Sequence, residues 1–284
     1  MSNLKKIKTR INSIKSTQQI TRAMKLVASA KFQKAQTMLK NSLLYQTELK
    51  KIFKNLLCKA VIFQSPYFEE REIKNEGIII LTSDRGLCGS FNNNIIKRLK
   101  ERVEKNKEKG INTKIWVIGK KGKQYLEKSN LDIKEYFIGV YNKLEPETAS
   151  KILLPLLNLY KNKEIDNIVF IYNAFKSTLV QTVSELTILP ISINIETDNE
   201  YYLYEPDYET LLNYTIENYL VNLFYRIIIE SMASENAARM TAMDNATNNA
   251  KELINILTIK YNRERQAVIT KEISEIVGGA AALE

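Results

Sequence analysis

The sequence predicts an α/β protein in which two long helices at the chain's ends flank a central domain built on a parallel sheet. Residues 1–65 and 207–277 contain neither glycine nor proline, although average usage would place roughly sixteen of these helix breakers there. Between them lie three continuous runs of β-branched and aliphatic residues. We therefore expect an N-terminal helix in 1–65, an α/β domain in 66–206 and a C-terminal helix in 207–284.

The first segment shows the apolar spacing of a helix that pairs with another helix. Apolar residues step by three and four positions, as in a coiled coil. They are Leu4, Ile7, Ile11, Ile14, then Ile20, Met24, Val27, and later Leu49, Ile52, Phe53, Leu56 and Leu57. We predict that this row of residues contacts the other long helix.

The middle of the chain alternates between strand-like and helix-like stretches. The runs "GIIILTSD" (77–84), "KIWVIG" (114–119) and "NIVFIYNAF" (167–175) are separated by helical stretches near 90–108 and 147–163. Uninterrupted apolar strands alternating with helices are typical of a parallel sheet covered on both faces.

The last segment resumes the coiled-coil pattern at Ile216, Leu220, Leu223 and Ile227, and again at Ile269, Ile273 and Ile276. Between these groups, small and polar residues replace large aliphatic ones. Helices of about 70 and about 60 residues would be roughly 105 and 90 Å long, so we expect them to protrude together or to be enclosed by another protein. The nearly bare apolar ending, "GGAAALE", also suggests a bound terminus, because free termini are usually polar.

Composition excludes several classes of enzyme. The 284-residue chain contains no histidine, which excludes imidazole bases, histidine-dependent triads and histidine-ligated zinc. Cys58 and Cys88 lack metal-site spacing, and we expect both to be reduced and buried. No apolar run is long enough to span a membrane, and we expect neither a signal segment nor a transit peptide.

Charge differs sharply between the two terminal segments. Residues 1–60 hold fourteen basic residues and one acid, Glu48, whereas residues 207–284 hold seven basic and eleven acidic residues. Opposite charge favours pairing of the two helices with each other. Binding of a nucleic acid by the basic arm is an alternative, but stacking aromatics are not interleaved with Lys8, Lys15, Arg22 and Lys25.

The loop after the first strand offers a second alternative, a nucleotide-binding enzyme. Gly86 and Gly89 lie between a strand and a helix, where glycines can cradle a phosphate. Their spacing matches neither GxGxxG nor the P-loop pattern. We therefore expect a tight turn, with Asp84 capping it, and assign no catalytic role to Asp84 or Arg85.

Three separated motifs resemble the gamma subunit of F-type ATP synthases, bacterial type. They are "INSIKSTQQITRAMKLVASAKFQKAQ" (11–36), "LTSDRGLCGSFN" (81–92) and "RERQAVITKEISEIVGGAAAL" (263–283). Their order and spacing agree along essentially the whole chain. The resemblance implies an antiparallel coiled coil of the N- and C-terminal helices beside a Rossmann-like α/β globular domain.

The resemblance also implies a function and partners. A gamma subunit is a central rotor shaft inside a hexamer of alpha and beta subunits, and its base lies with the epsilon subunit on the c-ring of the membrane sector. The implied subunit couples ion flow to ATP synthesis, has no catalytic activity by itself and binds neither a cofactor nor nucleic acid. The apolar C-terminus would be the tip of the shaft in an apolar sleeve. The implied location is the cytoplasmic face of a bacterial inner membrane.

Seven residues match motif positions that contact the beta subunits or brace the coiled coil in this family. Met24 and Lys25 lie in the first helix, and Arg239, Arg265, Gln266, Thr270 and Glu275 lie in the last. For Gln266 and Thr270, packing between the two helices is an equal alternative. For Lys25 we favour contact with an acidic partner loop, because a lysine among small residues has no evident packing role. No cysteine pair suited to a redox switch is present.

Overall fold

The computed structural model describes residues 2–57, 65–129, 131–178, 180–191, 205 and 207–281. Two helices are much longer than the others, α1 (Ser2–Leu57) with 56 residues and α5 (Tyr208–Ala281) with 74. The chain divides into two compact units, residues 1–28 with 239–284 and residues 29–238. We call them the helical-pair unit and the α/β unit, and each is described by itself.

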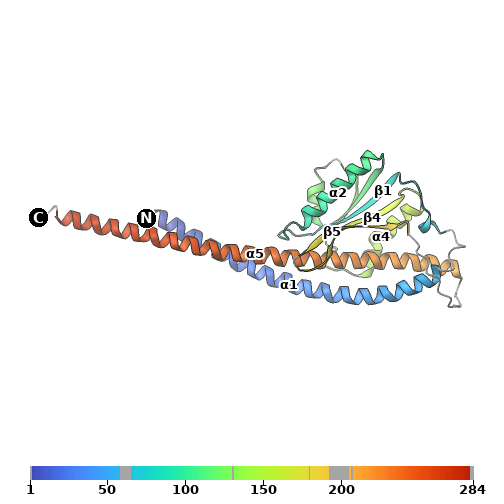
Figure 1. The fold of residues 1–284 in the computed structure, drawn as a ribbon, viewed down its shortest axis with the longest axis horizontal. Coiled ribbons are helices and arrows are strands. Elements are labelled where there is room, and N and C mark those ends of the chain that lie inside the picture. The colour runs from blue at the N-terminus through green and yellow to red at the C-terminus, as the bar shows by residue number, and fades with distance from the viewer. Residues whose placement is uncertain are drawn as a thin grey trace. The chain divides into compact units, whose positions relative to one another are not determined.

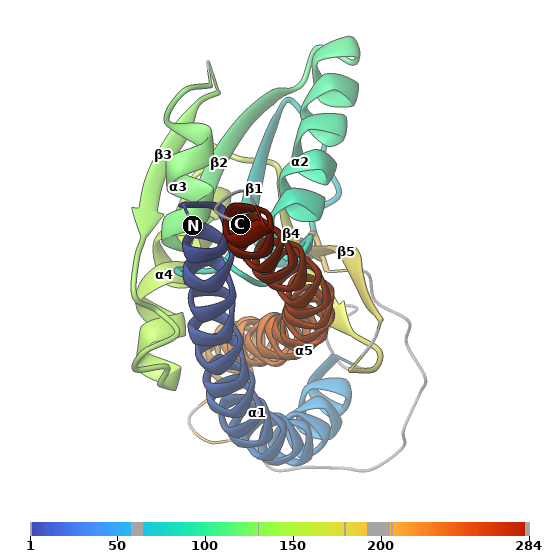
Figure 2. The ribbon, with the colours of Figure 1, turned by 90° about the vertical axis from the view of Figure 1, so that its left-hand side faces the viewer.

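The α/β unit contains a five-stranded sheet in the order β3-β2-β1-β4-β5, which Figure 2 labels from one edge to the other. The strands are β1 (Asn75–Leu81), β2 (Asn112–Ile118), β3 (Ile133–Phe137), β4 (Asn167–Phe175) and β5 (Gln181–Leu189). The first four are parallel, and β5 pairs antiparallel with β4. The predicted parallel sheet is therefore confirmed, with two additional edge strands.

Helices cover both faces of this sheet, as Figure 1 shows. On one face lie α2 (Phe91–Glu108) and α3 (Lys120–Leu126), packed on Ile78, Ile80 and Val117. On the other lie α4 (Pro146–Lys161) and the first part of α5, packed on residues that include Ile79 and Phe170. Isoleucines that alternate along β1 thus enter two separate cores, which explains why that strand is apolar without interruption. A short 3-10 helix, η2 (Pro66–Phe68), precedes the sheet.

Aromatic contacts attach α1 and α5 to each other and to the sheet within the α/β unit. Phe53 of α1 stacks on Tyr219 of α5 with ring centroids 4.8 Å apart, and Phe224 of α5 stacks on Phe170 of β4 at the same distance. Nearer residue 29, Phe32 and Ala35 pack with Ala233 and Ala237. Residue numbers rise along α1 as they fall along α5, so the two helices are antiparallel here.

The helical-pair unit is also antiparallel. Thr21 contacts Thr247, and one turn further along α1, Lys25 contacts Asp244. Figure 1 shows α5 continuing past the beginning of α1. Along α5, a row of buried and half-buried side chains with heptad spacing ends at Val268. The described side chains after Val268 are exposed.

The interhelical row on α1 differs from part of the prediction. Ile7 and Ile11 are buried as expected, but Ile20, Val27 and Ile52 are 60%, 56% and 54% exposed. A row of buried and half-buried positions on α1 instead keeps a 4-3 spacing, at Ile7, Ile11, Ile14, Gln18, Thr21, Lys25 and Ala28. We call this row the interhelical seam. It passes through polar residues, which is why an apolar pattern alone placed it wrongly.

A second correction concerns the end of α5. Ile269, Ile273 and Ile276 are 46%, 56% and 71% exposed, so they do not continue the interhelical seam. By the Thr21–Thr247 and Lys25–Asp244 contacts, these isoleucines lie further along α5 than the position opposite the start of α1. The partner helix has simply ended before it reaches them.

Candidate functional site

The seven predicted interface residues lie in the helical-pair unit, and the structure places them in three different environments. Met24 is half-buried beside the interhelical seam, and Lys25 occupies a seam position. Arg239 is buried, with 9% of its surface exposed. Arg265, Gln266, Thr270 and Glu275 are exposed on α5. The structure therefore brings Met24 and Lys25 together and leaves the last four on the far part of α5.

Lys25 has a partner within the chain that sequence reasoning missed. Its Nζ donates to Asp244 Oδ1 at 2.6 Å, and the two side chains are 39% and 45% exposed. The expectation that Lys25 has no packing role within the chain is therefore wrong, whereas its contact with an acidic partner loop stays a prediction. A useful signal existed, because extending the 4-3 spacing from Ile7 places position 25 in the seam and calls for a complementary residue on α5.

Thr21 and Thr247 form a second polar contact beside the first. Their hydroxyl oxygens lie 2.8 Å apart, and Thr247 Oγ1 also lies 2.7 Å from the Met243 carbonyl, to which it donates. Thr21 Oγ1 similarly lies within donating distance of the Gln18 carbonyl. Thr21 is 8% exposed, so its hydroxyl meets the requirement that a buried polar group be hydrogen-bonded.

The four exposed residues on α5 make only local contacts among those described. Thr270 Oγ1 donates to the Gln266 carbonyl at 2.9 Å, and Glu275 lies 3.6 Å from Lys271, one turn away on the same helix. Since Gln266 and Thr270 are exposed, the alternative that they pack the two helices together is not what the structure shows. Their side chains are available to a partner protein.

Helix α1 also has exposed apolar residues near Met24 and Lys25. Ile20, Leu26 and Val27 are 60%, 66% and 56% exposed. These three apolar side chains are exposed within two turns of α1. The apolar spacing in the sequence predicts Ile20 and Val27 in the row that meets α5, and their exposure shows that this prediction is wrong.

At the carboxyl end of the parallel sheet, where α/β proteins usually bind nucleotides, the end of β4 packs against both long helices. The Phe175 backbone N–H donates to Glu230 of α5 at 3.2 Å. Phe175 also packs against the cluster formed by Phe32, Ala233 and Ala237. The end of β4 is thus in contact with the chain's own helices.

The loop after β1 forms a tight turn, as predicted. Ser83 Oγ donates to the Arg85 carbonyl at 2.6 Å, and Gly89 has a φ of +59°. Asp84 has a structural role, as expected, but it plays this role at other loops and not, as predicted, by capping the turn that follows β1. Its carboxylate accepts the backbone N–H groups of Lys120, at the start of α3, and Gly139, after β3, at 3.0 and 3.2 Å. Cys88 is buried, and its Sγ accepts a hydrogen bond from Asn92 Nδ2 at 3.3 Å. Cys58 lies outside the described residues.

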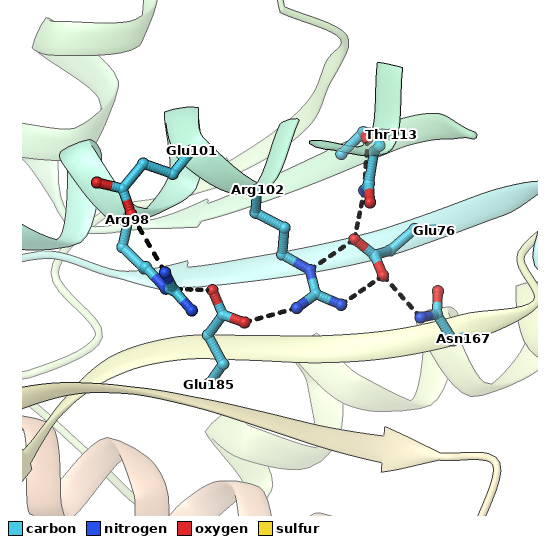
Figure 3. Close-up of polar contacts among 8 residues, drawn as sticks. Glu76, Arg98, Glu101, Arg102, Thr113, Asn167 and Glu185 are labelled. Atoms are coloured by element: carbon cyan, nitrogen blue, oxygen red, sulfur yellow. Dashed lines mark hydrogen bonds and ion pairs between the residues drawn. The ribbon is translucent and has the colours of Figure 1, made fainter. Parts of the chain in front are cut away.

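The largest ionic network lies at the opposite end of the sheet (Figure 3). Arg102 of α2 donates to Glu76 of β1 through Nε at 2.8 Å and Nη2 at 2.7 Å, and to Glu185 of β5 through Nη1 at 2.6 Å. Asn106 and Asn167 also donate to Glu76. Burial by itself raises the pKa of Glu76, but the hydrogen bonds and the Arg102 charge outweigh it and lower that pKa.

This network fits a structural role better than a catalytic one. Glu76 is 2% exposed, and its oxygens are taken by hydrogen bonds from side chains of the same unit. The Glu76 hydrogen bond raises the pKa of Arg102 despite its burial, so both groups stay charged. The network ties α2, β1, β4 and β5 together. Within the described ranges, we find no group of three or more potential metal-ligating side chains.

Among the helices that the structure describes, none combines the length and apolar character needed to cross a membrane.

Comparison with known proteins agrees along the full length. A family model described as ATP synthase matches residues 3–283. The chain is 38% identical over 293 aligned residues to the ATP synthase gamma chain of Heliobacterium modesticaldum and 40% identical over 292 to that of Chlorobaculum tepidum, with 100% of each chain covered in both cases.

Solved structures share the fold at lower identity. A chain of the Euglena gracilis mitochondrial ATP synthase, in a structure of its OSCP, F1 and c-ring parts, has a TM-score of 0.70 at 20% identity, covering 99% of this chain and 95% of that one. A chain from the central stalk and c-ring of the Tetrahymena thermophila enzyme has a TM-score of 0.63 at 24% identity, covering 80% and 99%. At these identities the likeness concerns the fold.

Proposed function

The chain belongs to the ATP synthase gamma chain family, and on that premise we propose that it is the central rotor shaft of an F-type ATP synthase. The observation that carries this proposal is the match to curated gamma chains at 38–40% identity over the whole of both chains. The long antiparallel helix pair of the helical-pair unit suits this task, because a helix pair of this kind can enter a partner protein.

The partners in this proposal are the alpha and beta subunits of the catalytic head, the epsilon subunit and the c-ring. Rotation of the ring would turn the shaft, and the shaft would present a different face to each beta subunit in turn. Such a shaft changes the nucleotide affinity of a site only through contacts that differ among the site's conformations. The two helices of the pair differ in charge and in exposed side chains, which supplies the required asymmetry.

The residues that we propose to contact the beta subunits or to brace the coiled coil are Met24, Lys25, Arg239, Arg265, Gln266, Thr270 and Glu275. The exposed group on α5 and the outer face of α1 formed by Ile20, Leu26 and Val27 support this assignment by their exposure. Arg239 is buried, so we propose that it braces the chain and does not reach a partner directly. The division into 1–65, 66–206 and 207–284 remains our proposed functional division into shaft, base and shaft.

We propose further that the chain has no catalytic activity by itself and associates peripherally with the cytoplasmic face of the bacterial inner membrane through the rest of the complex. Two features support the first part. The chain lacks histidine, and its own helices contact the end of β4, at the end of the sheet where an α/β enzyme would bind a nucleotide.

Reconstitution tests this function directly. The chain is co-expressed with the alpha and beta subunits encoded in the same genome, and the complex is purified through a tag on beta. A bead on the α/β unit should then rotate when ATP is added to an immobilised head. Failure of the chain to copurify, or a complex that hydrolyses ATP with a stationary bead, would reject the shaft proposal.

A further inference from the structure

One section of the interhelical seam has fewer large apolar side chains than the section nearest the N-terminus. In that N-terminal section, Ile7 and Ile11 are 7% and 8% exposed, and Ile14 is half-buried. The seam positions on α1 that follow Ile14 are Gln18, Thr21, Lys25 and Ala28. Small or polar side chains bury little apolar surface, so they contribute little of the hydrophobic free energy that normally pairs two helices.

The facing section of α5 is similarly poor in apolar surface. Met243 is buried, but the seam positions that follow it are Thr247 and Ala250. Of the large apolar residues nearby on α1, Met24 is half-buried beside the seam, whereas Leu26 and Val27 are more than half exposed. Pairing of the helices in this section therefore depends more on polar contacts than it does near Ile7 and Ile11.

Polar contacts described in this section cross from α1 to α5. They are the Lys25–Asp244 ion pair at 2.6 Å and the Thr21–Thr247 contact at 2.8 Å. We name these four residues the polar clasp. Thr21 is 8% exposed, whereas Lys25 and Asp244 are each roughly two-fifths exposed. The ion pair is thus accessible to dissolved salt, which screens it.

We propose that the polar clasp holds the two helices together where apolar packing is sparse, and that this section opens locally when the Lys25–Asp244 pair is broken or screened. The inference concerns the chain itself and goes beyond the proposed function, so its failure would leave the assignment as a rotor shaft intact. Local opening of a section with few buried apolar contacts requires less free energy than opening of a well-packed core.

Hydrogen exchange on the full-length chain measures this opening. Amides of α1 in residues 15–28 are compared with those in residues 5–14, at low salt, in the wild-type chain and in the variants Asp244→Asn and Lys25→Gln. We expect exchange in 15–28 to rise about threefold in both variants, as for loss of a half-exposed ion pair, and to change little in 5–14. The exchanged pair Lys25→Asp/Asp244→Lys should restore most of the protection.

A matched control and a measurement on the wild-type chain keep the test decisive. Glu48→Gln breaks the exposed Lys51–Glu48 pair on the same helix and should leave exchange in 15–28 unchanged. Raising the salt concentration to about 0.5 M should speed exchange in 15–28 of the wild-type chain but not of Asp244→Asn. The salt comparison in the wild-type chain stands even if a variant fails to fold.

Three results would overturn the proposal. These are equal exchange of Asp244→Asn and wild type in residues 15–28, absence of any salt effect there in the wild-type chain, and a reversed pair that exchanges as fast as the single variants.

Discussion

Lys25 has two roles at the scale of single residues, one shown by its contact with Asp244 and one proposed toward a partner. The ion pair is half-exposed, so the same ammonium can be approached from outside. Charge pairs that remain partly exposed typically contribute 0–1 kcal/mol. Neither role excludes the other, and the two can be separated by mutation.

We predict that Lys25→Glu in an assembled complex weakens coupling more than assembly. A reversed charge facing an acidic partner loop should introduce repulsion of order 1 kcal/mol or more. The measurement is the ratio of ATP-driven ion pumping to ATP hydrolysis, which should fall. Adding Asp244→Lys should restore the intramolecular pair without restoring the ratio. If the double variant regains the wild-type ratio, Lys25 acts within the chain alone.

Glu76 gives a prediction about acid stability. Its pKa is lowered in the folded chain, so its carboxylate stabilises the fold above its ordinary pKa of about 4.5. This contribution is lost as pH falls through the lower folded pKa. We expect Glu76→Gln to destabilise the chain by about 1–3 kcal/mol near pH 7. The difference in free energy of unfolding between the wild-type chain and Glu76→Gln, measured by urea unfolding, should shrink steadily below pH 4.5.

Glu101→Gln is the matched control for Glu76. Glu101 belongs to the edge of the same network, where it meets Arg98 at 3.2 Å with both side chains 42% exposed. Glu101→Gln should lower the free energy of unfolding by at most a few tenths of a kcal/mol. It should not change how the stability of the chain falls at low pH. Equal effects of the two substitutions would contradict the special place of Glu76 in the network.

At the scale of secondary-structure elements, the main feature is that α5 extends beyond the position opposite the start of α1. Side chains beyond Val268 on α5 have no partner helix, and Ile269, Ile273 and Ile276 remain exposed. The end of α5 thus contributes little to the stability of the isolated chain. Its apolar residues become useful only if another protein covers them.

Truncation of α5 should separate these two contributions. Deleting residues 278–284 should leave a complex that assembles and rotates, since only Leu283 is lost as a large apolar anchor, worth about 1.5–3 kcal/mol if fully buried. Deleting back to residue 262 should impair assembly, because it removes the three isoleucines together with Arg265, Gln266 and Glu275. Membrane ATPase activity and ion pumping measure both effects.

The isolated chain provides the control for that series. Both truncated chains should show thermal unfolding of the α/β unit close to that of the intact chain, since residues 29–238 form their own compact unit. Equal damage to the complex by the short and long deletions would mean that the last seven residues carry torque themselves.

At the scale of the whole molecule, we predict that the purified chain hydrolyses no ATP. The chain has no histidine, and α5 and α1 residues pack at the end of β4. The measurement is a phosphate-release assay on the isolated chain, with a chain carrying Glu230→Gln as a control for contaminating ATPases. Activity that purifies with the chain and changes in that variant would contradict the prediction.

The sequence by itself determined the two long helices, the three central parallel strands and the family. Each of these rests on local patterns, such as the absence of glycine and proline from the terminal segments or the uninterrupted apolar run in β1. Three motifs spread along the chain carried the family resemblance, and full-length similarity confirmed it.

Only the tertiary structure decided which side of each helix pairs with the other. The interhelical seam runs through Gln18, Thr21 and Lys25. The 4-3 spacing from Ile7 can place these positions in the seam, but it does not say which residues of α5 they meet. Asp244 lies more than two hundred positions away, so nothing near Lys25 in the sequence points to it. The exposure of Ile269, Ile273 and Ile276 has the same cause, because where α1 ends along α5 depends on how the two helices are aligned. Local sequence sets what each segment forms, whereas the alignment of distant segments sets which side chains meet.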